Sequence, residues 1–172
     1  MRSITAISTA GLLLAAAEAA LAAPMSYDCD TAAGSFSELS QVQDGPAYHV
    51  RGTITPLQWR EHERWLASGQ VRLETGDGSR SIAVQVIRPR GAERASFAIT
   101  VDSGNRPITT TIGEVGLNEA VPFDVTLFPS GDAVVQFGTE RRVYHLDLGR
   151  NLHVKVVCST GEFLFGELDL GG

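Results

Sequence analysis

Three carboxylates near the end of the sequence could in principle do glycosidase chemistry. The stretch VVCSTGEFLFGELDL, residues 156–170, contains Glu162, Glu167 and Asp169. Residues two apart on a strand share a face, and paired carboxylates on one face cleave sugars in many glycosidases. A retaining enzyme also needs a separate acid/base across the bond, and this strand offers no third carboxylate beyond Asp169. The stretch therefore predicts a structural strand with solvated carboxylates and no catalytic residue.

The aromatic residues of the same stretch raise a problem of alternation. Phe163 and Phe165 share their parity with Glu167, so a regular strand with both rings in the core would bury Glu167 and Asp169 without partners. A β-bulge at Gly166, which would reverse the alternation, or fraying near the terminus resolves the conflict.

The histidines are the candidate metal ligands. A three-residue loop over residues 148–150 would pair the flanking strands in a hairpin and place His145 opposite His153, with Asp147 beside them. Two imidazoles and a carboxylate can bind zinc, but Lys155 on the same face adds an unfavourable positive charge. Nucleophile and phosphate-binding motifs are also missing from the sequence. We therefore predict no metal site, no cofactor and no enzymatic activity, and keep His145 and His153 as candidate ligand-binding residues.

The two tryptophans are the strongest indication of a binding surface. Trp59 and Trp65 lie in the segment TPLQWREHERWLASG, which has no clear core pattern. Exposed aromatic rings can stack on a sugar, whereas large aromatics more commonly pack against the core. Both interpretations remain open at this point, and both residues are candidate ligand-binding residues.

The elements that must position these residues are predicted to be β-strands. From residue 47 onward, apolar and polar residues alternate with period two between turns rich in glycine, aspartate, serine and asparagine. Ten stretches fit strands: 47–55, 70–75, 81–89, 95–102, 107–115, 122–129, 132–138, 141–148, 152–158 and 162–170. Short strands with short loops favour an all-β, antiparallel β-sandwich, and the loops are too short for the crossover helices of a parallel sheet.

At most one short helix is expected, over residues 55–69. Thr55 and Gln58 could form a capping box, Pro56 could occupy the first turn and Gly69 could end the helix. The apolar residues of this segment do not form a clean stripe, so a long irregular loop is the alternative.

The N-terminal residues have the pattern of a secretory signal peptide. Arg2 precedes an apolar stretch, and Ala20, Leu21 and Ala22 form a small-residue cleavage pattern, so we expect residues 1–22 to be removed. Residues 23–172 would then form a single domain in the periplasm or outside the cell. In such an oxidising compartment the two cysteines, Cys29 and Cys158, are expected to form one disulfide.

The charge of the chain excludes some partners. The formal net charge is −6, and it stays −6 after signal cleavage because one basic and one acidic residue are removed. Such a surface repels nucleic acids and anionic lipids. We expect no nucleic-acid binding and no membrane insertion after signal cleavage.

The order of elements from Gly52 to Leu170 resembles the concanavalin A-like lectin and glucanase superfamily, including its laminin G-like members. The resemblance lies in VRGTI, VRLETGDGSRSIAVQVI, SFAITVDSG, PFDVTLFPSGDAVVQFG and VVCSTGEFLFGELDL. It implies a jelly-roll sandwich with ligands on the concave face or at the loop rim. The family's glucanases carry Glu, Asp and Glu along an inner strand, and Glu167 and Asp169 match only the first two, so that activity does not carry over.

These observations predict an exported, non-catalytic bacterial binding module with a glycan as the leading ligand. A structural or adhesive module that recognises a cell-surface protein is the second hypothesis. A polysaccharide-active enzyme is the third.

Overall fold

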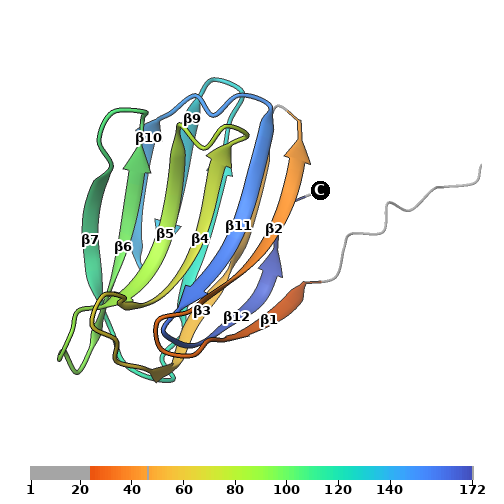
Figure 1. Ribbon diagram of the computed structural model, residues 1–172. Coiled ribbons are helices and arrows are strands. Elements are labelled where there is room, and N and C mark those ends of the chain that lie inside the picture. The colour runs from red at the N-terminus through yellow and green to blue at the C-terminus, as the bar shows by residue number, and fades with distance from the viewer. Residues whose placement is uncertain (1–23, 46, 172) are drawn as a thin grey trace, which may run out of the picture.

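The computed structural model describes residues 24–45 and 47–171, and this part of the chain forms twelve β-strands and no helix (Figure 1). The strands are β1 (Met25–Asp30), β2 (Phe36–Asp44), β3 (Tyr48–Trp59), β4 (Ala67–Thr75), β5 (Ser81–Arg88), β6 (Ala95–Asp102), β7 (Ile108–Val115), β8 (Val121–Leu127), β9 (Asp132–Phe137), β10 (Glu140–His145), β11 (Asn151–Ser159) and β12 (Gly161–Asp169). The predicted signal peptide lies outside the described residues.

The strands form two antiparallel sheets of six strands each. One sheet has the order β1-β12-β3-β8-β9-β10, and the other has the order β2-β11-β4-β5-β6-β7. The second sheet lies in front of the first in Figure 1. The prediction of an antiparallel β-sandwich is confirmed.

Alternation of apolar and polar residues produces the core between the sheets. On β11, Leu152, Val154 and Val156 are fully buried, whereas the intervening His153 and Lys155 are only partly buried. Successive side chains of a strand point to opposite faces, so each strand contributes one apolar row to the interior and one polar row to solvent. Burial of these rows from both sheets is the main favourable contribution to folding.

The predicted bulge at Gly166 is present. The register of β12 against β3 shifts between Gly166 and Asp169, and Glu167 adopts a left-handed backbone with φ of 51°. The bulge reverses the alternation, so Phe165 and Leu168 are both buried while Glu167 is exposed. The carboxylates of the closing strand therefore avoid the core, as predicted, and Asp169 lies 3.4 Å from Nε of Arg51.

Of the two alternatives for residues 55–69, the short helix is absent from the structure. β3 continues to Trp59, and Thr55 pairs with Leu164 of β12 instead of capping a helix. Residues 60–66 form an irregular loop that is shorter than the one predicted as the alternative, and β4 begins at Ala67. Without a continuous apolar stripe a helix here would have had no face to bury, whereas residues 55–59 as a strand pair with β12.

The hairpin predicted around residues 148–150 is also wrong. β10 pairs with β9 in one sheet, and β11 pairs with β2 and β4 in the other. The connection therefore crosses between the sheets, and its alternate residues Leu146 and Leu148 are buried on the way. Alternation is satisfied equally well by a hairpin and by a crossover, because both bury the same apolar residues.

Two strands have no counterpart in the sequence prediction. β1 and β2 precede residue 47, and β2 is an edge strand in which most residues are partly or fully exposed. Its period-two signal is weak because an edge strand buries little of its apolar face.

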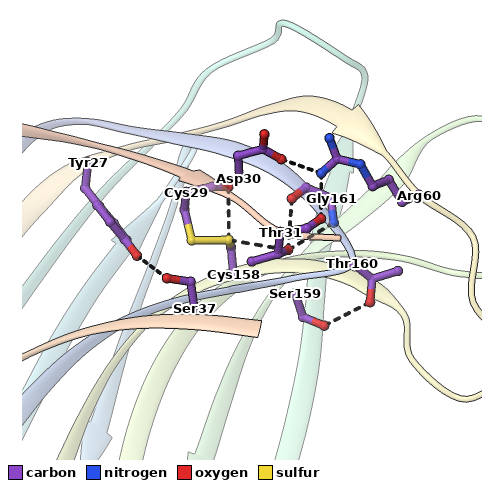
Figure 2. The surroundings of a disulfide bond; sticks show 10 residues. All are labelled: Tyr27, Cys29, Asp30, Thr31, Ser37, Arg60, Cys158, Ser159, Thr160 and Gly161. Atoms are coloured by element: carbon purple, nitrogen blue, oxygen red, sulfur yellow. Dashed lines mark hydrogen bonds and ion pairs between the residues drawn. A yellow bond between two sulfur atoms is a disulfide. The ribbon is translucent and has the colours of Figure 1, made fainter. Parts of the chain in front are cut away.

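The predicted disulfide between Cys29 and Cys158 is present and joins β1 of one sheet to β11 of the other (Figure 2). Both residues are almost completely buried. Thr31 lies beside the bond, and its hydroxyl donates to the carbonyl of Gly161 at 3.0 Å. The link therefore anchors the first strand across the sandwich.

Candidate functional site

The solvent side of the sheet β2-β11-β4-β5-β6-β7 carries many polar side chains, which we call the polar face. Its members alternate with core residues along each strand, and several are in register across neighbouring strands. Val157 lies between Glu38 and Gln70, and Ala83 lies between Arg72 and Thr100. The residues of the polar face are Glu38, Ser40, Gln70, Arg72, Glu74, Gln85, Thr100, Thr109, His153 and Lys155.

Ion pairs connect the part of the polar face on β2, β11 and β4. Nζ of Lys155 lies 2.9 Å from Oε1 of Glu74 and 3.6 Å from Oε1 of Glu38. The Glu74 carboxylate raises the pKa of Lys155, which stays protonated at neutral pH. Nε of Arg72 is 2.9 Å from the other carboxylate oxygen of Glu74, without the alignment of a hydrogen bond. One carboxylate therefore lies between two cations.

Neutral hydrogen-bonding groups connect the part of the polar face on β5, β6 and β7. Nε2 of Gln85 donates to Oγ1 of Thr100 at 3.0 Å, and the hydroxyls of Thr100 and Thr109 are 2.9 Å apart. The Gln85 carbonyl and its second amide hydrogen have no role in these bonds and can pair with a ligand.

An exposed aromatic pair, Phe36 and Trp65, lies at one end of the polar face. The two rings stack with centroids 6.0 Å apart and an interplanar angle of 13°. Phe36 is 60% exposed and Trp65 is 40% exposed, although both are large apolar side chains. Phe36 begins β2 and pairs with Ser159 at the end of β11, which places the rings beside the last row of the sheet.

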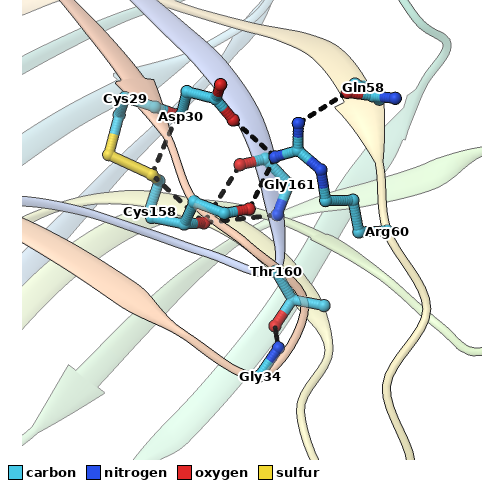
Figure 3. A network of polar contacts seen from close by, with 9 residues as sticks. Cys29, Asp30, Gly34, Gln58, Arg60, Cys158, Thr160 and Gly161 are labelled. Carbon is cyan, nitrogen blue, oxygen red and sulfur yellow. Dashed lines mark hydrogen bonds and ion pairs between the residues drawn. A yellow bond between two sulfur atoms is a disulfide. The ribbon is translucent and has the colours of Figure 1, made fainter.

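Several polar contacts hold the loop that carries Trp65. Nη1 of Arg60 donates to Oδ1 of Asp30 and to the carbonyl of Thr31, both at 2.5 Å, while Nη2 donates to Gln58 at 2.7 Å (Figure 3). Nη2 of Arg90 donates to the carbonyls of His62 and Glu63 within the loop.

The segment that leads into Phe36 is held in place as well. The amide of Gly34 donates to the hydroxyl of Thr160 at 3.2 Å (Figure 3). A Cβ on Gly34 would stand 2.7 Å from Nε2 of His62, so the two loops pack closely. The aromatic pair therefore joins the start of β2 to the loop 60–66, and close packing of Gly34 against His62 fixes the two segments together.

The two candidate tryptophans, Trp59 and Trp65, have different environments in the structure. Trp59 is half-buried at the end of β3, its ring meets Phe163 edge-on at 5.8 Å, and its Nε1 is buried without a hydrogen-bond partner. It packs against the core, as one of the two alternatives proposed. Trp65 is the exposed one, and it borders the polar face.

The two candidate histidines lie in different sheets. His145 is on β10, where its Nδ1 is 3.1 Å from Oδ1 of Asp132 and lowers the pKa of that carboxyl by hydrogen bonding. His153 stands on the polar face, in register with Glu74. The structure therefore does not bring the two imidazoles together.

Phe36, Arg72 and Gln85 are members of this site that sequence reasoning missed. Phe36 lies on an edge strand that was not recognised, although FSELSQVQD does alternate. Arg72 and Gln85 lie in correctly predicted strands, but only the order of strands in the sheet shows that they share a face.

Other features of the described residues bear on metal binding and membranes. Within residues 24–45 and 47–171, no group of three or more histidine, cysteine, aspartate or glutamate residues is arranged to hold a metal ion. The same residues include no helix of the length and hydropathy needed to cross a membrane.

Comparison with known proteins shows similarity at the level of the fold. No family model matches the sequence, and no curated protein matches it either. An alginate lyase from Alteromonas sp. 272 superposes with a TM-score of 0.55 at 11% identity, over 84% of this chain and 68% of the lyase. The carbohydrate recognition domain of Emp46p superposes with a TM-score of 0.54 at 8% identity, over 83% of this chain and 86% of that domain.

A carbohydrate-binding module, CBM66 from Bacillus subtilis, gives a TM-score of 0.50 at 11% identity, over 84% of this chain and 86% of the module. These structures and the two six-stranded sheets show that the chain has the concanavalin A-like jelly-roll fold. The resemblance noted in the sequence is confirmed for the fold.

Proposed function

We propose that this protein is a non-catalytic glycan-binding module whose ligand lies along the polar face and against the aromatic pair. The observation that carries the proposal is the exposed Phe36–Trp65 stack at the end of a polar face. A sugar ring offers an apolar side that fits an aromatic ring and hydroxyls that fit amides and charged groups. Emp46p and CBM66 are described as carbohydrate-binding, which supports the choice of ligand class.

The length of the polar face suits an oligosaccharide better than a single sugar. His153 and Ser159 are six residues apart on β11, which corresponds to about 20 Å of strand. A ligand that touches both the aromatic pair and the ion pairs must extend along much of this length.

The arrangement of carboxylates supports a role without catalysis. Glu38 and Glu74 both contact the ammonium group of Lys155, so they lie next to each other and do not face each other across a ligand. Glu162, Glu167 and Asp169 are on β12, in the other sheet. A hydrolase would instead need an acid and a base placed across one glycosidic bond.

A glycan array followed by calorimetry tests the proposal with the purified protein. Trp65→Ala should weaken binding by about fivefold, because stacking against an aromatic ring contributes about 1 kcal/mol. Phe128→Ala is the matched control, since Phe128 is 46% exposed in the loop between β8 and β9, outside the proposed site. Absence of binding to every glycan, or equal losses in both variants, would contradict the proposal.

We further propose that the module is exported. The Cys29–Cys158 disulfide is compatible with an oxidising compartment. Intact mass of the protein recovered from the periplasm or medium should correspond to residues 23–172, and recovery of the full chain in the cytoplasm would contradict export.

A further inference from the structure

The ligand class of the polar face can be narrowed from its charges. Within the described strands of this sheet, the polar face contains two cationic side chains of the lysine and arginine type, Lys155 and Arg72. Both contact Glu74. The Glu74 side chain is only 11% exposed, so its carboxylate is largely shielded from water between the two cations. Removing this carboxylate from its partners would leave a poorly hydrated charge, which is costly.

An anionic ligand would therefore have to compete with Glu74 for Nζ of Lys155 and for Nε of Arg72. Glu38 adds a second carboxylate next to Lys155, at 3.6 Å. Asp102 and Glu114 lie on the same side of the sheet, in register with Ser81 and Ser96 respectively. On the strands of this side, the acids Glu38, Glu74, Asp102 and Glu114 outnumber Lys155 and Arg72, and Arg94 lies 3.7 Å from Glu114. The whole chain carries a net charge of −6. The resulting field repels polyanions.

The polar face also offers a ligand a row of neutral groups. Gln70 and Gln85 are adjacent in register on β4 and β5, and they present planar amides that both donate and accept. Thr100 and Thr109 continue the row of neutral groups across β6 and β7. Such groups match sugar hydroxyls, which also donate and accept, and they carry no charge that would favour a uronate or a sulfate.

We infer that the polar face binds an uncharged glycan, and that Glu74 excludes acidic polysaccharides by occupying Lys155 and Arg72. This inference rests on the proposed glycan-binding function and specifies its ligand. It also predicts that exclusion can be relieved by one substitution, because Glu74→Gln leaves a side chain of similar shape, frees Arg72 from its ion pair and leaves Lys155 with only the longer contact to Glu38.

The test compares binding of neutral polysaccharides (dextran, laminarin, galactan and levan) with binding of two polyuronates (alginate and polygalacturonate), by affinity electrophoresis and calorimetry. The unmodified protein should bind at least one neutral polymer with an affinity that changes little between low and high salt, and neither polyuronate. Glu74→Gln should gain polyuronate binding by about tenfold, and salt should abolish the gain because it screens exposed charges.

Glu140→Gln is the matched control, because it removes the same charge from an exposed glutamate on β10 of the other sheet. It should gain no polyuronate binding. A thermal melt identifies a Glu74→Gln variant that fails to fold, and Glu74→Ala, which removes the same carboxylate, then replaces it.

The outcomes distinguish the two proposals. Polyuronate binding by the unmodified protein, lost at high salt, would overturn the inference and leave glycan binding intact. An equal gain in the Glu74 and Glu140 variants would also overturn it. Failure to bind any polymer, neutral or acidic, would overturn the proposed function itself.

Discussion

The disulfide between Cys29 and Cys158 is expected to contribute a large part of the stability of this fold. The two residues are 129 positions apart, so the bond closes most of the described chain into one loop. In the chain-entropy model a loop of this size lowers the entropy of the unfolded state by about 17 cal/mol/K, which is about 5 kcal/mol at 25 °C. For a domain of this length, a loss of that size corresponds to a fall in Tm of about 10–20 °C.

Reduction of the unmodified protein isolates the effect of the disulfide, because it breaks only the S–S bond and keeps every side chain. Cys29→Ala with Cys158→Ala removes the sulfur atoms as well. Since both sites are buried, the double variant should be less stable than the reduced protein by the cost of the small cavities. Both differences in the free energy of unfolding can be measured by urea unfolding of the oxidised protein, the reduced protein and the double variant. Alkylation followed by intact-mass measurement confirms that the thiols are free only in the reduced protein.

The reasoning has a clear point of failure. A loss of less than about 2 kcal/mol on reduction would show that the unfolded chain is already constrained without the bond, or that the oxidised fold is strained. Free thiols in the protein before reduction would contradict the disulfide itself.

Three further predictions concern the backbone and one surface turn. Gly69→Ala should lower the free energy of unfolding by about 1–3 kcal/mol, measured in urea, because its Cβ would stand 2.6 Å from the buried Phe163 ring. Glu167→Gly should raise that free energy by up to about 1 kcal/mol, since Glu167 has a φ of 51°, and a loss would contradict the strain argument. Hydrogen bonds from Thr75 and Ser79 lower the pKa of Asp77 from 3.8 to about 2, so its stabilising effect is complete above pH 4 and is lost as the pH falls through 2. Asp77→Asn should therefore flatten the stability curve between pH 4 and 2, and an unchanged slope in an acid titration of unfolding would refute this.

Local rules were sufficient where a residue's neighbours in sequence decide its environment. The bulge at Gly166 could be predicted because Phe163 and Phe165 would otherwise bury the carboxylates that follow. Rules of the same kind failed at residues 148–150, where the buried Leu146 and Leu148 fit a hairpin and a crossover equally well. Alternation shows which side of a strand is apolar and does not show which sheet the strand joins.

The candidate site was predictable only in part, for a related reason. Trp65 was identified as a candidate because it lies outside any core pattern, and it is indeed exposed. Trp59 has the same sequence context, but β3 extends far enough to pack it against Phe163. Phe36 was missed because an edge strand leaves most of its side chains exposed and therefore shows a weak pattern.

The sequence by itself determined the β-sandwich class, most of the strands and the partner of each cysteine. These follow from the period of apolar residues, the turn residues and the number of cysteines. Only the tertiary structure decided that β2, β11 and β4 are adjacent, and hence that Glu38, Lys155, Glu74 and Arg72 form one set of ion pairs. Strand order depends on contacts between residues far apart in the chain, and no local pattern encodes it.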